Sequence, residues 1–167
     1  GIPYDGKYIF SAMGYNFLPS EISAAFAIEQ LKKLKNNINI RIKNFKFLEN
    51  FFKKYSNFVK LPSQNKNVKT GWLAFPLVLN EHGRIKRKNL QIYLEQKGIQ
   101  TRTIFTGNIL RQPIMKGQYF KKHKFATSVS DDVMKNGILI GCHHGLKLKE
   151  LKYMCKTFEK YLASIKY

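Results

Sequence analysis

The sequence is poor in cysteine and in acidic residues, and it has no long apolar run. Its two cysteines, Cys142 and Cys155, stand in unrelated contexts, which favours a reduced cytoplasmic protein over a disulfide framework. No apolar stretch approaches the ~20 residues that a membrane-spanning helix needs, so we expect no membrane partner. The chain opens at Gly1-Ile2-Pro3 without an initiator methionine, and we expect it to begin inside a longer protein.

The familiar catalytic signatures are also missing. The sequence has no Ser-His-Asp set, no GxSxG elbow and no glycine-rich phosphate loop. Cys142-His143-His144 offers zinc-type ligands, but neighbouring side chains at a strand end point to opposite sides. The remaining histidines, His82 and His123, stand in separate loops. We therefore expect no metal site, and instead a strand end with a buried cysteine and polar histidines.

Positive charge is what the sequence has in excess. Lysine and arginine number 30 against 10 acidic residues, a formal net charge of +20. A basic surface attracts phosphate-rich partners, so a basic nucleic-acid-binding module is one hypothesis. The lysines are spread along the chain, however, whereas a dedicated nucleic-acid site clusters basic residues with exposed aromatic side chains. The composition favours a low-GC coding bias, and we expect nucleic acid not to be the partner.

Hydrophobic spacing predicts an α+β domain, and 167 residues with 44% hydrophobic content suit one compact core. The prolines and glycines of residues 1–19 are typical of an ordered loop. From Ser20, apolar side chains recur every three or four residues and predict a long helix to about Tyr55. The remaining pattern predicts a small three-stranded sheet with covering helices: strands at 72–79, 99–105 and 137–141, and helices at 87–97 and 148–165.

Single residues refine these elements. Pro76 predicts that the first strand lies at a sheet edge or carries a bulge. Gly98 is expected to end the shorter helix, and Ser130-Asp131-Asp132 is interpreted as the cap of a brief helical turn. Two packed layers result. We divide the chain into a loop segment (1–19), a long connecting helix (20–56) and a small C-terminal α+β domain (57–167).

An ordered set of motifs along the whole chain resembles a known family. The set comprises Gly14-Tyr15-Asn16, Glu21, Ala24-Ala25, Gln30-Leu31, Arg41, Lys97-Gly98-Ile99-Gln100-Thr101-Arg102 and a closing Gly-Cys-His-His-Gly-Leu segment. In this order and spacing it resembles the DegT/DnrJ/EryC1/StrS family of sugar aminotransferases and dehydratases. The resemblance implies the C-terminal small domain of a fold-type I enzyme that uses pyridoxal or pyridoxamine 5′-phosphate, with residues 1–19 in the cofactor-binding region.

The resemblance also implies a homodimer in which Asn16 reaches the cofactor phosphate of the neighbouring subunit. An amide suits this role because its NH2 group donates to phosphate oxygens; the alternative is that Asn16 caps a turn before Pro19. The lysine or histidine that defines the reaction stands upstream of the Gly-Tyr-Asn motif in the family. The resemblance therefore implies no catalytic residue in this segment, and no activity for the segment alone.

The residues after Arg102 separate two branches of the family. Aminotransferases usually carry Tyr/Phe-x-Pro-Leu-His there, whereas Gly107-Asn108 followed by Gln112-Pro113 resembles the nucleotide-sugar 3-dehydratase branch. In that branch a histidine replaces the lysine and the cofactor works in its pyridoxamine form. We expect a 4-keto-6-deoxyhexose 3-dehydratase of deoxysugar or surface polysaccharide biosynthesis, with a nucleotide-sugar aminotransferase as the alternative.

The same resemblance nominates the substrate side of the site. The partner it implies is a nucleotide-diphosphate sugar, and a separate iron–sulfur reductase is left open as a second partner. Arg102, Asn108 and Arg111 are the predicted substrate-binding residues, because an arginine fork suits a diphosphate. For Arg111 a surface ion pair is the alternative role.

Overall fold

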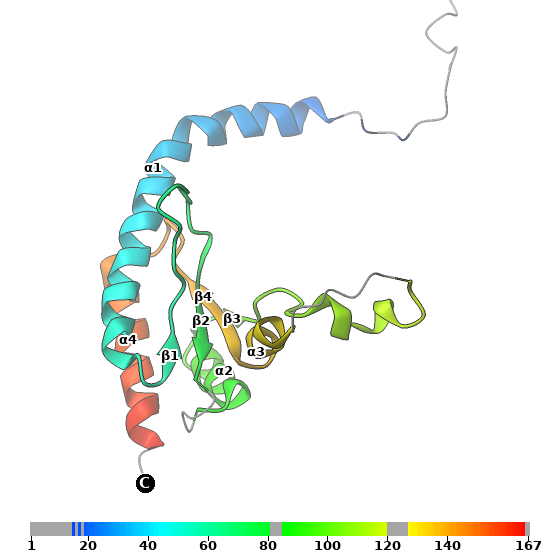
Figure 1. Ribbon diagram of the computed structural model, residues 1–167. Helices are drawn as coiled ribbons and strands as arrows, with labels where there is room; N and C mark the ends of the chain where they lie inside the picture. The colour runs from blue at the N-terminus through cyan, green and yellow to red at the C-terminus, as the bar shows by residue number, and fades with distance from the viewer. Residues whose placement is uncertain (1–14, 16, 18, 81–84, 120–126, 166–167) are drawn as a thin grey trace, which may run out of the picture. The chain divides into compact units, whose positions relative to one another are not determined.

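The computed structural model describes residues 15, 17, 19–80, 85–119 and 127–165 (Figure 1). The chain forms two compact units, Gly1–Leu34 and Lys35–Tyr167. The larger unit contains the sheet, its covering helices and the C-terminal half of the long helix. The division at residues 19 and 56 stays a prediction.

The long helix expected from Ser20 is α1 (Glu21–Phe52), and the 3-10 turn η2 (Lys53–Tyr55) continues it. In the N-terminal unit its large apolar side chains are exposed: Ile22, Phe26, Ile28, Leu31 and Leu34. In the larger unit, Phe45, Leu48 and Phe52 are buried in the core. The apolar residues of the same helix are therefore exposed in the N-terminal unit and buried in the larger unit.

The sheet has four antiparallel strands in the order β1-β2-β4-β3. Their bounds are β1 (Val59–Lys60), β2 (Ala74–Leu79), β3 (Thr101–Arg102) and β4 (Gly137–Gly141). All three expected strands are present, although β3 keeps only two residues of the predicted 99–105. The additional strand β1 is also two residues long, too short to show an alternating pattern in the sequence.

Pro76 sits in an inner strand, not in the edge strand that the sequence suggested. Its partner on β4 is Leu139. On the other side, β1 pairs only with Val78 and Leu79. Proline cannot donate a ladder hydrogen bond, and the short β1 stops before it reaches this position. Pro76 therefore has no β1 partner to which an N–H would have to donate, although β2 as a whole has a neighbouring strand on each side.

Helices α1 and α4 (Leu148–Ser164) lie side by side against the sheet (Figure 1). Alternate residues of β2, Phe75, Leu77 and Leu79, point into this core, as the two-residue period of a strand requires. The Phe75 ring stands 4.9 Å from that of Phe45, and the Phe52 ring is 4.9 Å from that of Phe158 on α4. Aromatic packing thus joins both helices to the sheet.

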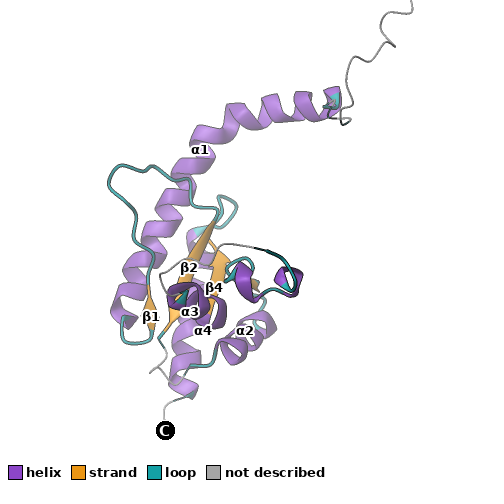
Figure 2. Cartoon of the chain, turned by 45° about the vertical axis from the view of Figure 1, so that its right-hand side comes forward, coloured by secondary structure: helices purple, strands orange, loops and turns teal. Residues whose placement is uncertain are grey.

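Two shorter helices complete the larger unit. As predicted, Gly98 follows α2 (Arg87–Gln96) in a left-handed conformation, with φ +73°. Helix α3 (Ser128–Asn136) contacts β2 and β4, and Figure 2 shows it in front of these strands. The predicted cap at Ser130-Asp131-Asp132 is wrong, because the helix begins at Ser128 and these residues lie within it. None of the helices in the described ranges combines the length and apolar character that crossing a membrane requires.

Candidate functional site

The segment that follows β4 is held by a buried amide from α1. Asn44 is 7% exposed, and its Nδ2 donates to the carbonyl oxygens of His143 at 2.9 Å and Leu146 at 3.3 Å, with a longer contact to Cys142 at 3.5 Å. A buried NH2 group needs acceptors, and free carbonyls of a loop need donors. Asn44 therefore fixes the Gly-Cys-His-His-Gly-Leu segment against the core.

Within this segment the cysteine is buried and both histidines are exposed, as the sequence predicted. The Cys142 thiol donates to the carbonyl oxygen of Trp72 at 3.5 Å, and burial raises the pKa of this thiol to about 11 despite the nearby Arg41. His143 Nδ1 accepts from the Gly145 N–H at 3.2 Å. A thiol that stays protonated at neutral pH is a poor metal ligand or nucleophile. The described residues offer no cluster of three potential metal ligands.

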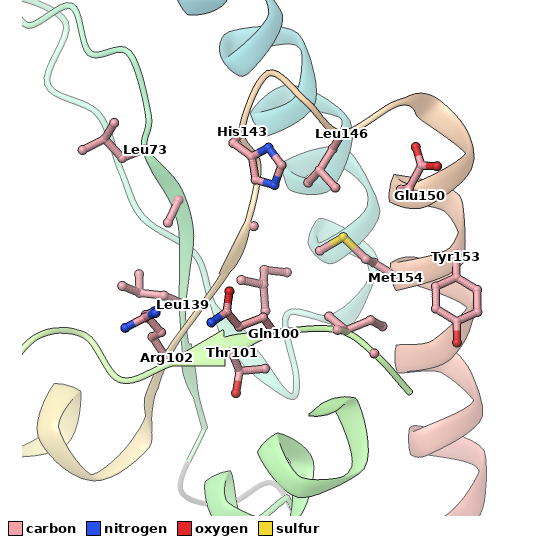
Figure 3. A pocket seen from close by; sticks show the side chains of 15 residues that line it. Leu73, Gln100, Thr101, Arg102, Leu139, His143, Leu146, Glu150, Tyr153 and Met154 are labelled. Carbon is pink, nitrogen blue, oxygen red and sulfur yellow. The ribbon is translucent and has the colours of Figure 1, made fainter. Parts of the chain in front are cut away.

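A cavity of about 410 Å³ lies beside this segment, between β3, β4 and α4 (Figure 3). Its apolar lining includes Leu139, Leu146 and Met154, and polar side chains of Arg102 and His143 also border it. This volume and this mixture of an apolar lining with a few polar groups are typical of small-molecule sites. The cavity is therefore the candidate site to which Arg102 belongs.

Arg102 reaches the cavity from β3, where it stands opposite Leu139 of β4. Its side chain is exposed and makes no ion pair with the described residues. Its neighbour Thr101 is anchored on α2, because the Glu95 carboxylate accepts from the Thr101 backbone N–H at 2.6 Å and from its hydroxyl at 2.9 Å. The strand is thus held in place while the guanidinium keeps its hydrogen-bonding capacity.

Asn108 and Arg111 meet at a different place, on the carboxylate of Asp131 in α3. Asn108 caps the 3-10 turn η3 (Ile109–Arg111) and Arg111 is its last residue; η4 (Pro113–Met115) follows. Asn108 Nδ2 donates to Asp131 at 2.8 Å, and Arg111 donates through Nε at 3.0 Å and Nη2 at 2.9 Å. Asn108 Oδ1 also accepts from the Leu110 N–H at 3.1 Å. The ion pair that was the alternative role of Arg111 is present.

This network shifts the acid–base equilibrium of Asp131. Hydrogen bonds from Arg111 and Asn108 lower the pKa of this carboxyl from 3.8 to about 2. A carboxyl whose pKa is lowered by folding stabilises the fold above its unfolded pKa, and that contribution is lost as pH falls through the folded pKa. The relevant window therefore runs from about pH 4 down to about pH 2.

We expect Asp131→Asn to lower stability at pH 7, with a deficit that shrinks as pH falls through this window. The amide cannot hold Arg111 as a carboxylate does, but at low pH the native Asp131 is protonated as well. Urea unfolding followed by circular dichroism across the pH range checks this expectation. Glu29→Gln, which removes an exposed carboxylate paired with Lys32, is the control. A deficit for Asp131→Asn that is constant from pH 7 to pH 2 would contradict the assignment.

The structure thus separates the predicted site residues. Asn108 and Arg111 come together at Asp131, Arg102 lines the cavity beside β3, and Asn16 lies outside the described residues. Sequence reasoning missed Asn44 and Glu95, which position backbone segments, and it assigned Asp131 to a cap. Asn44 meets its partners about a hundred residues later and Glu95 meets Thr101 across the turn after α2, so neither contact has a signal in helical periodicity.

Residues 1–159 match the model of the DegT/DnrJ/EryC1/StrS aminotransferase family. The chain belongs to this family, and the resemblance indicated by the sequence motifs is confirmed. It is 30% identical, over 96% of its length, to the lipopolysaccharide biosynthesis protein RfbH of Salmonella typhimurium. It is 32% identical, over 95% of its length, to the GDP-4-keto-6-deoxy-D-mannose 3-dehydratase of Yersinia pseudotuberculosis. The chain spans 36% and 39% of the lengths of these two relatives.

A solved structure shows the same fold. The GDP-4-keto-6-deoxy-D-mannose-3-dehydratase of E. coli with bound hydrated PLP matches 92% of this chain and 39% of its own, with a TM-score of 0.80 and 29% sequence identity. The expected α+β small domain of a fold-type I enzyme is therefore confirmed, with a fourth short strand added to the predicted sheet.

Proposed function

We propose that this chain is the C-terminal part of a nucleotide-sugar 3-dehydratase that works with pyridoxal or pyridoxamine 5′-phosphate. The observation that carries the proposal is the similarity, over nearly the whole chain, to the 3-dehydratase of Y. pseudotuberculosis. The dehydratase-type motif also supports it, because its residues shape the loop after β3. Gly107 adopts a left-handed conformation, Asn108 donates to Asp131, and Gln112 donates to the Thr106 carbonyl. In this proposal the complete protein is a cytoplasmic homodimer of deoxysugar or surface polysaccharide biosynthesis.

The described residues supply only part of a cofactor site. None of the described residues that line the cavity beside Arg102 is a lysine, so this cavity offers no amine for a covalent link to the cofactor. In the proposal Asn16 donates to the cofactor phosphate across the dimer, and other parts of the protein supply the remaining contacts. The bound cofactor supplies an electron sink for loss of the C-3 hydroxyl.

The substrate-side residues take distinct roles in the proposal. Arg102 donates to the diphosphate of the nucleotide sugar, because its guanidinium borders the cavity and makes no ion pair with the described residues. Arg111 uses two of its five N–H donors on Asp131, so the ion pair orients the guanidinium and the remaining donors face outward to substrate. Asn108 is 4% exposed and shapes the loop that carries Arg111.

Product analysis of the complete protein tests the proposed reaction. The protein is incubated with GDP-4-keto-6-deoxymannose and the cofactor, with L-glutamate in one reaction and a reduced iron–sulfur protein in another. We expect mass spectrometry to show a sugar that has lost its C-3 oxygen. A product that keeps this oxygen and carries a new amine would instead identify an aminotransferase. The two reactions also decide whether a separate iron–sulfur reductase is needed.

A further inference from the structure

A second cavity, of about 340 Å³, lies where α2 meets the loop after β3. Its lining includes Arg87 at the start of α2 and Thr103, Phe105, Gly107 and Gln112 of the loop, and residues of α3 close it. Arg87 is the first residue of α2, and its Nη1 is buried without a hydrogen-bond acceptor among the described residues. A guanidinium cannot lose its charge in a protein, and a buried donor without an acceptor is costly. The cavity is therefore lined by a cation whose hydrogen bonding is incomplete among the described residues.

The walls of the cavity do not supply the missing acceptor. Thr103 donates its hydroxyl hydrogen to the Phe105 carbonyl at 3.0 Å, and Gln112 Nε2 donates to the Thr106 carbonyl at 3.0 Å. None of the described lining residues is acidic. Two residues of the wall, Phe105 and Gly107, adopt positive φ values, 45° and 67°. Such a conformation at Phe105 is costly and persists only where the surroundings enforce it.

The nearby carboxylates of α3 are engaged elsewhere. Asp131 accepts from Arg111 and Asn108, as described above. Asp132 accepts from Lys60 at 3.0 Å and from Asn136 at 2.7 Å. Among the described residues next to Arg87 in the sequence, Lys86 and Lys88 are basic, and the first turn of α2 has no acidic residue. The positive end of the helix dipole adds to this potential.

We propose that this cavity binds a phosphate group, with the Arg87 guanidinium as its principal donor. A phosphate fits better than a neutral ligand because it offers several acceptor oxygens and the negative charge that the described lining lacks. The volume lies in the range of small-molecule sites, so there is room for part of the molecule that carries the phosphate. The phosphate site does not depend on the proposed function, in which Arg102 contacts the diphosphate of the nucleotide sugar from the other cavity.

Calorimetric titration of the 167-residue chain with pyrophosphate tests the site. Arg87→Gln keeps a side-chain amide but removes the charge, and we expect it to weaken pyrophosphate binding at least tenfold. Lys88→Gln is the matched control, because Lys88 is the exposed neighbour on the same helical turn and does not line the cavity. It removes the same charge, and we expect less than a twofold change. Equal losses in the two variants would mean attraction by net charge alone and would overturn the proposal.

Nuclear magnetic resonance of the unaltered chain provides a test that needs no variant to fold. We expect pyrophosphate to shift the side-chain N–H signals of Arg87 and the backbone amides of residues 103–107. Shifts confined to exposed lysines would contradict the site. Titration with GDP-mannose compares the nucleotide sugar with the free anion. Arg87-dependent binding without C-3 deoxygenation by the complete protein would uphold the site and refute the proposed function. C-3 deoxygenation together with pyrophosphate binding that does not depend on Arg87 would refute the site and uphold the proposed function.

Discussion

Replacement of Gly107 by alanine is expected to lower the free energy of unfolding by about 2–5 kcal/mol, the sum of a left-handed backbone penalty of about 1–2 kcal/mol and an overpacking penalty of about 1–3 kcal/mol. Gly107 has a φ of +67°, a region that favours glycine. A Cβ added there would stand 2.6 Å from the Cα of Met134 and closer still to its Cβ. Both atoms belong to the body of α3, so relief requires movement of the helix itself.

Gly117→Ala is the matched control for this prediction. Gly117 also has a positive φ, +80°, but a Cβ added there would meet nothing within 4 Å. It should therefore show the conformational penalty alone, about 1–2 kcal/mol. Urea unfolding monitored by circular dichroism measures both variants. Equal losses at the two glycines would contradict the close approach of α3 to the loop.

A second-site change sharpens the same test. Met134→Ala leaves both the Cα and the Cβ that an alanine at position 107 would meet. We therefore expect Met134→Ala not to restore the stability of Gly107→Ala. Recovery in the double variant would show that the outer part of the methionine side chain, and not the helix body, opposes the added methyl group.

Arg102→Ala is expected to lower kcat/KM of the complete enzyme by about 10- to 100-fold, which corresponds to the loss of a charged hydrogen bond of about 1.5–3 kcal/mol. This expectation rests on the proposed function, in which Arg102 donates to the diphosphate of the substrate. The loss should fall mainly on KM if the contact is the same in the ground state and the transition state. Arg102→Lys should recover activity only in part, because an ammonium lacks the planar fork of a guanidinium.

Steady-state kinetics with the nucleotide sugar checks this prediction. Lys152→Ala is the control, because Lys152 is an exposed cation of α4 that does not line the cavity. The stability of Arg102→Ala should stay close to that of the parent, since Arg102 makes no ion pair with the described residues. Unchanged kcat/KM in Arg102→Ala, or an equal loss in Lys152→Ala, would exclude the proposed contact.

The elements with a long periodic pattern were predictable from the sequence. Helices α1 and α4 lie within three residues of their expected bounds, because their apolar spacing reflects the faces that they bury. The start of α3 was not predictable, since Ser and Asp favour caps in isolation. Here Asp131 serves instead as a partner for Arg111, a residue twenty positions earlier. Local propensity contains no information about such a partner.

The predicted substrate-side residues also show what the sequence can and cannot reveal. The motifs identified the family and nominated Arg102, Asn108 and Arg111 together, because ordered residue types can be compared without coordinates. Only the fold separated them, placing Arg102 at one cavity and tying the other two to α3. The unpaired guanidinium N–H of Arg87 also became visible only there, because burial and hydrogen bonding depend on the whole packed chain.

The sequence by itself determined the family, the α+β class and the long amphipathic helix, since each follows from residue types at a fixed spacing. Tertiary structure decided where Pro76 could sit, which carboxylate holds Arg111, and that Arg87 Nη1 is buried without an acceptor among the described residues. These outcomes depend on contacts between residues distant in the sequence. The free energy of such contacts arises from burial and geometry that no local pattern encodes.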